Sequence, residues 1–531
     1  MKKYFGVMLD MSRNAVMKPS EVVAYAKILK SFGYNMIQLY TEDTYEVEGE
    51  PYFGYMRGRY TVKQLSYIVE ECEKIGVEVI PCIQTLAHLN QALRWQKVYG
   101  EITDVGDILL AGEERTYELI ENMFKSLRKS FTSKYVHIGM DEAEMIGRGK
   151  YFNKHGYRNH LEILNEHLLK VIEIGKKYGF EPMMWSDMFF KLATGGEYYD
   201  IHANVTEEVK NAVPKEVGLV YWDYYHDDKE TYDGMFSAHK KFNNEIWFAG
   251  GAWTWTGFAP GNKLTMNRMR LAMQSAREHG IDNVLMTCWG DNGKECSFYA
   301  ILPALYATKR YYDGETDENK IKAEFEEITD EKFDNFTALD LPNYVGGNTT
   351  VEGNVCKHAL YSDPFNGFLD CVCDKAGVGE EYAKHAEKLQ GIGKESQYAY
   401  LFESASALCR VLELKYDLGV RTRMAYQSGD KEGLQGLIGD YTETLARLEN
   451  FYGKFRALWY KENHPSGFDI QDLRLGGLKQ RLISCRERLQ EYLDGKIESI
   501  PELDEEILQY FEKDSTPNYI AWKLISTGNR N

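Results

Sequence analysis

The chain has 531 residues, which is more than one ordinary globular domain and predicts two or three domains. Hydrophobic residues make up 44% and charged residues 27%, a composition that is typical of a globular protein with a large core and excludes a disordered or fibrous one. The formal net charge of -18 argues against nucleic acid as a partner, because a phosphate backbone is bound by a basic surface.

The N-terminal segment MKKYFGVMLDMSRN contains only a short apolar stretch, shorter than the apolar core of a signal peptide. No apolar run of about 18 residues follows it, so the sequence predicts no membrane span and no membrane partner. The cysteines are scattered and match no usual zinc or redox spacing. We therefore expect a reduced, cytoplasmic protein without a metal or another cofactor.

Short runs rich in β-branched and aromatic residues alternate with amphipathic stretches of helical length over residues 1–310. This alternation is typical of βα units with parallel strands, and eight such units close a (β/α)8 TIM barrel. The predicted strands are Tyr4–Asp10, Met36–Glu42, Val77–Gln84, Tyr135–Asp141, Pro182–Asp187, Gly218–Asp223, Glu245–Trp253 and Asn283–Asp291.

Polar and aromatic residues gather where these runs end, in LDMSR, YTEDTYE, IQTLAHLN, GMDEAE, MWSDM, YWDYY, GGAWTW and CWGDN. An open doubly wound sheet binds its ligand at one switch point, whereas a barrel uses the ends of all its strands. The sequence thus predicts an α/β fold with the active site at the C-terminal end of the barrel.

Strand patterns stop after residue 310, and long helical patterns follow it. We predict a catalytic barrel over residues 1–310 and an α-helical C-terminal domain over residues 311–531. The segment 336–354 is rich in Gly, Asn and Thr and is predicted to be a loop that links the domains or reaches over a neighbouring active site. The predicted helices include Glu380–Asp417, Lys431–Lys454, Leu473–Leu493 and Pro501–Lys513.

A pair of acids ends the fourth predicted strand, in YVHIGMDEAE. Strand alternation places Asp141 on the face opposite to the apolar Val136 and Ile138, so Asp141 should point to the barrel axis. Glu142 is the first residue past the strand, where the chain can turn and bring its carboxylate into the same pocket. Two carboxylates at one strand end suit acid and base chemistry on a glycosidic bond.

HIGMDE resembles the His-x-Gly-x-Asp-Glu signature of glycoside hydrolase family 20, the β-N-acetylhexosaminidases. LDMSR resembles the first-strand segment of this family, GRYT (58–61) its Gly-x-Tyr-Thr loop, and PCIQTLAH its third-strand segment, with Ala87 in place of a glycine. YWD (221–223) is similar to the sixth-strand Tyr-x-Asp/Asn, and WGD (289–291) to the eighth-strand Trp-Gly-Glu. The resemblance covers residues 1–310 and is closest to a compact bacterial type that lacks the N-terminal α/β domain.

This resemblance implies an exo-acting enzyme that removes terminal β-linked GlcNAc or GalNAc with retention of configuration. The 2-acetamido oxygen of the substrate attacks the anomeric carbon and forms an oxazolinium ion, which is an exception to the use of a covalent carboxylate nucleophile. Glu142 would be the general acid and then the general base. Asp141 would accept the acetamido N–H, and the Tyr221 hydroxyl would hold the acetamido oxygen.

The other candidate residues would bind the sugar. Arg13 offers a fork of donors to vicinal hydroxyls, and Asp291 would accept from hydroxyls at the far end of the sugar. Tryptophans at the strand ends, Trp255 among them, would surround the acetamido methyl and the sugar ring; His137 and Glu295 are weaker candidates. The predicted substrate-binding residues are Arg13, His88, Trp185, Trp222, Asp223, Trp253, Trp289 and Asp291.

Two alternatives remain open from the sequence. A retaining barrel glycosidase of another type would use a covalent nucleophile, and Asp223 or Asp291 would then lie about 5–5.5 Å from Glu142. The second alternative, an inactive sugar-binding protein, is disfavoured by the acid pair. The sequence leaves open the choice between GlcNAc and GalNAc, and it also leaves open a homodimer, for which the helical domain offers surface.

Overall fold

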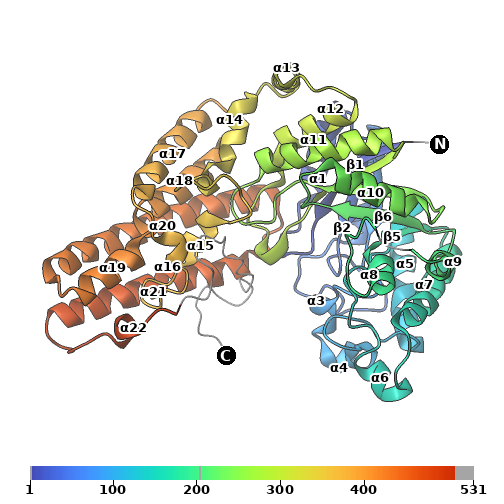
Figure 1. Cartoon of the computed structure of the whole chain (residues 1–531), viewed down its shortest axis with the longest axis horizontal. Helices are drawn as coiled ribbons and strands as arrows, with labels where there is room; N and C mark the ends of the chain where they lie inside the picture. The colour runs from blue at the N-terminus through green and yellow to red at the C-terminus, as the bar shows by residue number, and fades with distance from the viewer. Residues whose placement is uncertain (1–2, 203–204, 509–531) are drawn as a thin grey trace.

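Each predicted strand pairs in parallel with the strands before and after it, and the last strand pairs with the first. The predicted (β/α)8 barrel is therefore confirmed. The computed structural model describes residues 3–202 and 205–508, and it shows the barrel followed by helices (Figure 1). The strands are β1 (Tyr4–Asp10), β2 (Met36–Tyr40), β3 (Glu78–Cys82), β4 (Tyr135–His137), β5 (Glu181–Trp185), β6 (Gly218–Asp223), β7 (Ile246–Gly251) and β8 (Asn283–Cys288).

Several strands end earlier than predicted, because the chain turns before the polar residues at the strand ends. β4 ends at His137, and the backbone φ angles of Gly139 and Met140 after it are +72° and +70°. β2 ends at Tyr40, and Glu42 has a φ of +43°. Since a left-handed residue does not continue an extended strand, the side chains of Asp141 and Glu142 project from a turn and not from the strand ladder.

Side-chain alternation divides the strand residues into two cores. Residues that point to the barrel axis form one buried cluster, and residues on the outer face pack under the surrounding helices. In β6, Val220 and Trp222 belong to the axial set, whereas Leu219 and Tyr221 belong to the outer core. This division decides which side chains of each strand end can reach a ligand.

The amphipathic stretches between the strands form the helices around the barrel. α2 begins at a capping box in which the Thr61 side chain accepts from the Gln64 N–H, and it buries Leu65, Ile68 and Val69 on one face. The helices are α1 (Pro19–Ser31), α2 (Val62–Lys74), α3 (Asn90–Leu93), α4 (Gln96–Tyr99), η1 (Gly100–Ile102), α5 (Glu114–Arg128), α6 (Lys150–His155), α7 (His160–Lys177), α8 (Asp187–Thr194), α9 (Glu207–Ala212), α10 (Lys229–Lys240), α11 (Asn262–Glu278), η2 (Asp291–Gly293), η3 (Phe298–Ile301) and α12 (Leu302–Tyr312).

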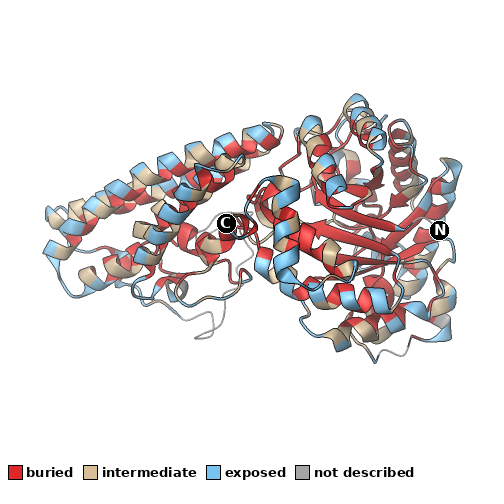
Figure 2. Ribbon diagram, turned by 90° about the horizontal axis from the view of Figure 1, so that it is seen from above, coloured by how far each residue is buried: buried red, intermediate tan, exposed pale blue. Residues whose placement is uncertain are grey.

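Within the described residues no strand follows β8. The helices that come after α12 extend to one side of the barrel in Figure 1, and in Figure 2 their outer faces are exposed while the barrel strands are buried. α18 packs against α17 and α20, and α20 packs against α21. The helices are α13 (Glu318–Thr329), α14 (Phe333–Thr337), η4 (Ala338–Asn343), α15 (Val355–Tyr361), α16 (Asp370–Cys373), α17 (Val378–Gly393), α18 (Ala399–Lys415), α19 (Leu418–Gln427), α20 (Lys431–Glu462), α21 (Phe468–Leu493) and α22 (Pro501–Asp504).

The helical predictions hold with changes in length. The pattern at 380–417 forms two helices, which are separated at residues 394–398, and α20 and α21 are longer than predicted. The pattern that begins at Pro501 forms only the short α22; residues 505–508 are not helical, and residues 509–513 lie outside the described residues. The predicted domain boundary after residue 310 falls within α12.

The segment 336–354 contacts the chain's own barrel. Its first part forms the end of α14 and the short helix η4, which the loop prediction did not include. Further along, Val351 is fully buried against Trp253, and Glu352 lies 3.0 Å from Arg268. The segment therefore packs behind the aromatic residues that follow β7 of the same chain.

None of the described helices is both long and apolar enough to cross a membrane. All nine cysteines lie within the described residues, and no disulfide links any two of them. In the described part of the chain, no three His, Cys, Asp or Glu side chains cluster closely enough to hold a metal ion.

Candidate active site

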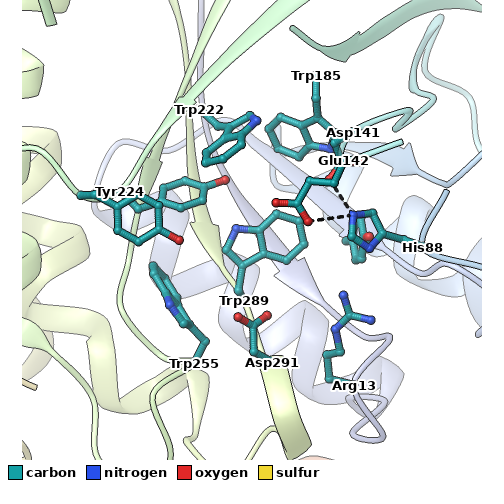
Figure 3. Close-up of a pocket in the computed structure, with 12 residues that line it drawn as sticks. Arg13, His88, Asp141, Glu142, Trp185, Trp222, Tyr224, Trp255, Trp289 and Asp291 are labelled. Carbon is teal, nitrogen blue, oxygen red and sulfur yellow. Dashed lines mark ion pairs between the residues drawn. The ribbon is translucent and has the colours of Figure 1, made fainter. Parts of the chain in front are cut away.

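The strand ends surround a pocket of about 550 Å3 that opens to solvent at the C-terminal end of the barrel. Most of the predicted site residues meet there, but Tyr221, Asp223 and Trp253 do not line it (Figure 3). The lining consists of Arg13, Tyr40, His88, Asp141, Glu142, Trp185, Trp222, Tyr224, Tyr225, Trp255, Trp289 and Asp291.

Asp141 and Glu142 lie on a strained turn after β4. Gly139, Met140 and Glu142 have φ angles of +72°, +70° and +51°. Non-glycine residues keep such angles only where their surroundings hold them, and such strain gathers at functional sites. One holding contact is the Glu142 N–H, which donates to Asp187 Oδ2 at 3.1 Å. The turn directs two adjacent carboxylates into one pocket, which an extended strand would not do.

Gly139 has no room for a side chain. A Cβ at this position would lie 2.0 Å from Gln84 Oε1, and Gln84 Nε2 donates to Asp141 Oδ1 at 2.7 Å. We expect Gly139→Ala to lower the free energy of unfolding by about 2–4 kcal/mol, because the clash adds to the strain of a left-handed alanine. Urea unfolding of the variant measures this loss.

The matched control for this prediction is Gly179→Ala. Gly179 has the same φ of +72°, but no atom lies within 4 Å of the added Cβ. The control should therefore lose only the cost of the left-handed conformation, about 1–2 kcal/mol. Equal losses in the two variants would show that the Gln84 contact does not exclude a side chain at Gly139.

Asp141 is buried between two donors. Its Oδ2 lies 3.2 Å from His88 Nε2, and its Oδ1 accepts from Gln84 Nε2. Burial acts to raise the pKa of Asp141, but the charge and hydrogen bonds of His88 and Gln84 outweigh it and lower the pKa. Burial acts to lower the pKa of His88, but Asp141 opposes it and raises that pKa to about 10. At neutral pH the pair is therefore a carboxylate beside an imidazolium.

The pKa of Glu142 is shifted in the direction opposite to that of Asp141. Burial and the adjacent Asp141 charge raise its pKa. Its Oε2 lies 3.5 Å from His88 Nε2, and its side chain is 51% exposed, so the carboxyl group lies at the open side of the pocket. Adjacent carboxyls with opposite pKa shifts can act as a fixed anion and a proton donor, which is the arrangement that general acid catalysis needs.

Arg13 and Asp291 lie together on another side of the pocket (Figure 3). Arg13 Nη1 lies 2.8 Å from Glu42 Oε1, which also accepts from the Tyr40 hydroxyl at 3.0 Å. Burial raises the pKa of Glu42 to about 7 and also raises the pKa of Asp291, while the Arg13 charge opposes both shifts. A held guanidinium beside a carboxylate offers both donors and acceptors to the hydroxyl groups of a ligand.

Aromatic rings form the remaining walls. The ring centroids of Trp185 and Trp289 lie 6.0 Å apart, and Trp222 stacks on Tyr224 with centroids 5.4 Å apart. Trp255 meets the Tyr224 ring edge-on at 5.6 Å. Flat apolar walls with a few polar groups between them suit a sugar ring that carries an apolar substituent.

Tyr221 and Asp223 lie outside the pocket, contrary to their predicted place. The Tyr221 hydroxyl donates to Asp223 Oδ2 at 2.7 Å, and the Tyr221 ring packs 4.8 Å from the His239 ring under α10. Asp223 also lies 2.8 Å from His226 Nδ1. The two residues do share a strand face, but it is the outer face, because Trp222 between them points to the axis.

Tyr224 brings a hydroxyl into the pocket where Tyr221 was expected. It lies two residues after Trp222, lines the pocket and is 5% exposed. Burial raises the pKa of Tyr224 well above its usual value, and the Asp141 charge adds to this shift. Tyr224 therefore stays protonated and can donate a hydrogen bond to a ligand.

Trp253 and His137 support the pocket from behind. Trp253 is 3% exposed and stacks on Trp255 with centroids 4.4 Å apart. The His137 ring lies 4.3 Å from Trp185, and burial lowers its pKa to about 3, so it is neutral. Glu295 does not reach the pocket either, because it is buried against side chains of the helical domain.

Tyr40, Tyr224 and Tyr225 line the pocket but were not identified from the sequence. The spacing contained a signal for Tyr224: residues two apart share a face, so a pocket that uses Trp222 also receives Tyr224 and excludes Tyr221. Tyr40 begins the strand-end segment YTEDTYE, but nothing in that segment distinguishes it from Tyr45.

Two models of known families match parts of this chain. Residues 3–231 match the family model described as glycosyl hydrolase family 20, catalytic domain. Residues 331–521 match the model described as glycoside hydrolase 20C C-terminal domain. The first match spans β1 to β6 of the barrel, and the second spans most of the helical domain.

The chain also has partial similarity to solved structures, with TM-scores below 0.5. A GH20 exo-β-N-acetylglucosaminidase from Vibrio harveyi has a TM-score of 0.47 and 14% identity, over 61% of this chain and 56% of its own length. A chitobiase from Flavobacterium johnsoniae has a TM-score of 0.47 and 15% identity, over 94% of this chain and 74% of its own length. A mutant β-hexosaminidase from Streptomyces plicatus has a TM-score of 0.43 and 16% identity, over 61% of this chain and 68% of its own length. The chain thus covers less than two thirds of the Vibrio harveyi enzyme.

Proposed function

Because the chain is a glycoside hydrolase with a family 20 catalytic domain, we propose that it is an exo-acting β-N-acetylhexosaminidase. Its substrates would be oligosaccharides or glycoconjugates with a terminal β-linked GlcNAc or GalNAc. The observation that carries this proposal is the geometry after β4: both carboxyls enter one pocket, where Asp141 lies 3.2 Å from His88 Nε2 and Glu142 lies at the open side. The directions of the pKa shifts, lowered for Asp141 and raised for Glu142, agree with it.

The first step breaks the glycosidic bond. Glu142 gives its proton to the leaving oxygen while the acetamido oxygen of the substrate attacks the anomeric carbon, and an oxazolinium ion forms. Asp141 accepts a hydrogen bond from the acetamido N–H and stabilises the positive charge that develops there. Tyr224 donates its hydroxyl to the acetamido group, and this role replaces the one expected for Tyr221.

The second step opens the oxazolinium ion. The Glu142 carboxylate takes a proton from water, the water oxygen bonds to the anomeric carbon, and the acetamido group is restored. Two inversions at one carbon give overall retention. Throughout both steps, Trp185, Trp222 and Trp289 would enclose the sugar and its acetamido methyl, whose burial is worth about 1 kcal/mol.

A covalent nucleophile is not favoured by the geometry of Asp223. Its carboxylate faces away from the pocket and is occupied by Tyr221 and His226. A retaining enzyme of the covalent type would need a second carboxylate about 5–5.5 Å from Glu142.

A panel of chromogenic substrates tests the proposal. The enzyme should cleave β-N-acetylglucosaminide or β-N-acetylgalactosaminide but not the plain β-glucoside, and a thiazoline analogue of the oxazolinium ion should inhibit it. Equal rates on the acetamido sugar and the plain sugar would contradict participation of the acetamido group. The ratio of the two N-acetylhexosaminide rates decides between GlcNAc and GalNAc.

The pH profile of the His88→Gln variant should move to higher pH. The charge of His88 lowers the pKa of both Asp141 and Glu142, so its removal raises both pKa values. Activity needs Asp141 ionised and Glu142 protonated, and therefore the acidic and the basic limbs of kcat/KM both shift upward. We expect a loss of about tenfold at the optimum. If both limbs of the profile stay at their wild-type pH and only the maximal kcat/KM decreases, this electrostatic role of His88 is contradicted.

A further inference from the structure

A strained turn after β8 carries Asp291 into the pocket. Three successive residues after it, Asn292, Gly293 and Lys294, have φ angles of +41°, +140° and +54°. Backbone of this kind costs free energy and persists only when its surroundings hold it. Inside the turn, the Lys294 N–H donates to the Gly290 carbonyl at 2.7 Å. The barrel holds the start of the turn, because the Gly290 N–H donates to Asp10 Oδ2 of β1 at 2.9 Å. The contacts to the Asn292 and Gly293 carbonyls come from outside the barrel.

α21 of the helical domain supplies these contacts. Arg474 Nη1 donates to the Asn292 carbonyl and also lies 3.1 Å from Glu295 Oε1. Gln471 Nε2 donates to the Gly293 carbonyl at 3.1 Å. A Cβ at Gly293 would meet Arg474 Nη1 at 2.5 Å, so the close approach of α21 requires a glycine there. Both carbonyls directly after Asp291 are therefore held by the helical domain.

A buried charged cluster reinforces this junction. Glu295 Oε1 lies 2.7 Å from Lys357 Nζ of α15 and accepts from Arg474, and the three side chains are 6% exposed or less. Charges buried in this way need partners in fixed positions, because an unpaired charge in a dry interface is strongly unfavourable. The cluster thus fixes the end of the turn relative to two helices of the C-terminal domain.

The end of α20 and the chain that follows it also hold the loops after β1 and β2. The Lys18 N–H donates to the Glu462 carbonyl at 2.8 Å, and the His464 N–H donates to the Val16 carbonyl at 2.8 Å. The His464 ring lies 2.8 Å from the Gly58 carbonyl. The loop after β1 is the one that carries Arg13. The helical domain therefore contacts the turns that bear both Arg13 and Asp291.

We propose that Arg474 is a positioning residue for sugar recognition, which acts through Asp291. The helical domain then forms part of the substrate site although none of its described residues lines the pocket. Arg474 holds the backbone directly after Asp291 and so fixes the position of the Asp291 carboxylate. This carboxylate would bind those hydroxyls of the terminal sugar that lie far from the anomeric carbon. This inference rests on the proposed function, because it assigns Asp291 to a sugar hydroxyl.

The Arg474→Met variant tests this role through the split between KM and kcat. Asp291 would contact the sugar equally in the ground state and the transition state, so its displacement should raise KM about tenfold and change kcat less than about threefold. Arg474→Lys keeps the charge and should recover part of the KM. In an Asp291→Asn background, Arg474→Met should add little, since two residues that act as one unit are not additive.

Arg481→Met is the matched control. Arg481 lies on the same helix and pairs with Asp363 at 2.8 Å, but both partners belong to the helical domain. The control should lose stability and keep the wild-type KM. If Arg474→Met folds poorly, Gln471→Leu removes one neutral hydrogen bond from the same turn and should raise KM in the same direction. Hydrogen exchange of the backbone of residues 288–296 should increase in the Arg474 and Gln471 variants and not in the control.

The outcomes separate the two proposals. A wild-type enzyme that cleaves none of the N-acetylhexosaminides contradicts the proposed function, and the hydrogen-exchange comparison then still tests whether α21 holds the turn. An active wild type whose KM does not change in Arg474→Met overturns the positioning role. A KM that rises equally in Arg474→Met and Arg481→Met also overturns it, because the effect would then come from a general loss of stability.

Discussion

Replacement of Glu142 by glutamine should lower turnover by about 10²–10⁴-fold on substrates whose leaving group needs a proton. Glutamine keeps the size of the side chain but cannot donate a proton to the glycosidic oxygen. Activated aryl glycosides leave without protonation, so their bond-breaking step should suffer much less. The measurement is kcat and kcat/KM on a natural disaccharide and on a nitrophenyl glycoside.

Glu144→Gln is the matched control for this result. Glu144 lies two residues further along the same turn, outside the pocket lining, and pairs with Lys191. Its loss should leave both substrates within about twofold of the wild type. If Glu142→Gln slows the two kinds of substrate by the same factor, Glu142 is not the acid and another group must protonate the leaving oxygen.

Tyr224→Phe should have the second largest effect. Its hydroxyl is the tyrosine donor that we assign to the acetamido group, and loss of one such donor to a developing charge lowers kcat by about 10²–10³-fold. The rate should fall on acetamido substrates even when the leaving group is activated, because the hydroxyl acts on the nucleophile and not on the leaving group.

Tyr221→Phe distinguishes this assignment from the one expected from the sequence. Its hydroxyl donates to Asp223 in the outer core, so the variant should lose about 1 kcal/mol of stability and keep kcat within about threefold. Thermal unfolding and initial rates of the two variants give the comparison. A larger fall in kcat for Tyr221→Phe than for Tyr224→Phe would reverse the two roles.

These two tyrosines show what the sequence can and cannot predict about direction. In β4 the apolar Val136 marks the outer face, so the inward direction of His137 could be predicted, whereas Asp141 reaches the pocket from the left-handed turn after β4, which strand alternation does not describe. In β6 both faces are apolar, with Leu219 and Tyr221 on one side and Val220 and Trp222 on the other. Alternation then groups the residues correctly but does not say which group faces the axis.

The barrel itself could be predicted because its signals are local: apolar runs of strand length, amphipathic stretches between them, and polar residues at one end of each run. The contacts between the barrel and the helical domain could not be predicted from the sequence. Arg474 reaches the Asn292 carbonyl across 182 positions of sequence, and a backbone carbonyl leaves no trace in the residue type. Glu295 was predicted as a weak pocket candidate, and its burial against Lys357 depends on a helix that begins 60 residues later.

The charged cluster of Glu295, Lys357 and Arg474 also limits how this chain can be recombined. Glu295 comes from the barrel, while Lys357 and Arg474 come from the helical domain. A chimera that takes its barrel from one relative and its helices from another would bury an unmatched charge unless all three positions suit each other. Substitutions at these positions should therefore be inherited together, and a hybrid library should yield folded chains only in the matched combinations.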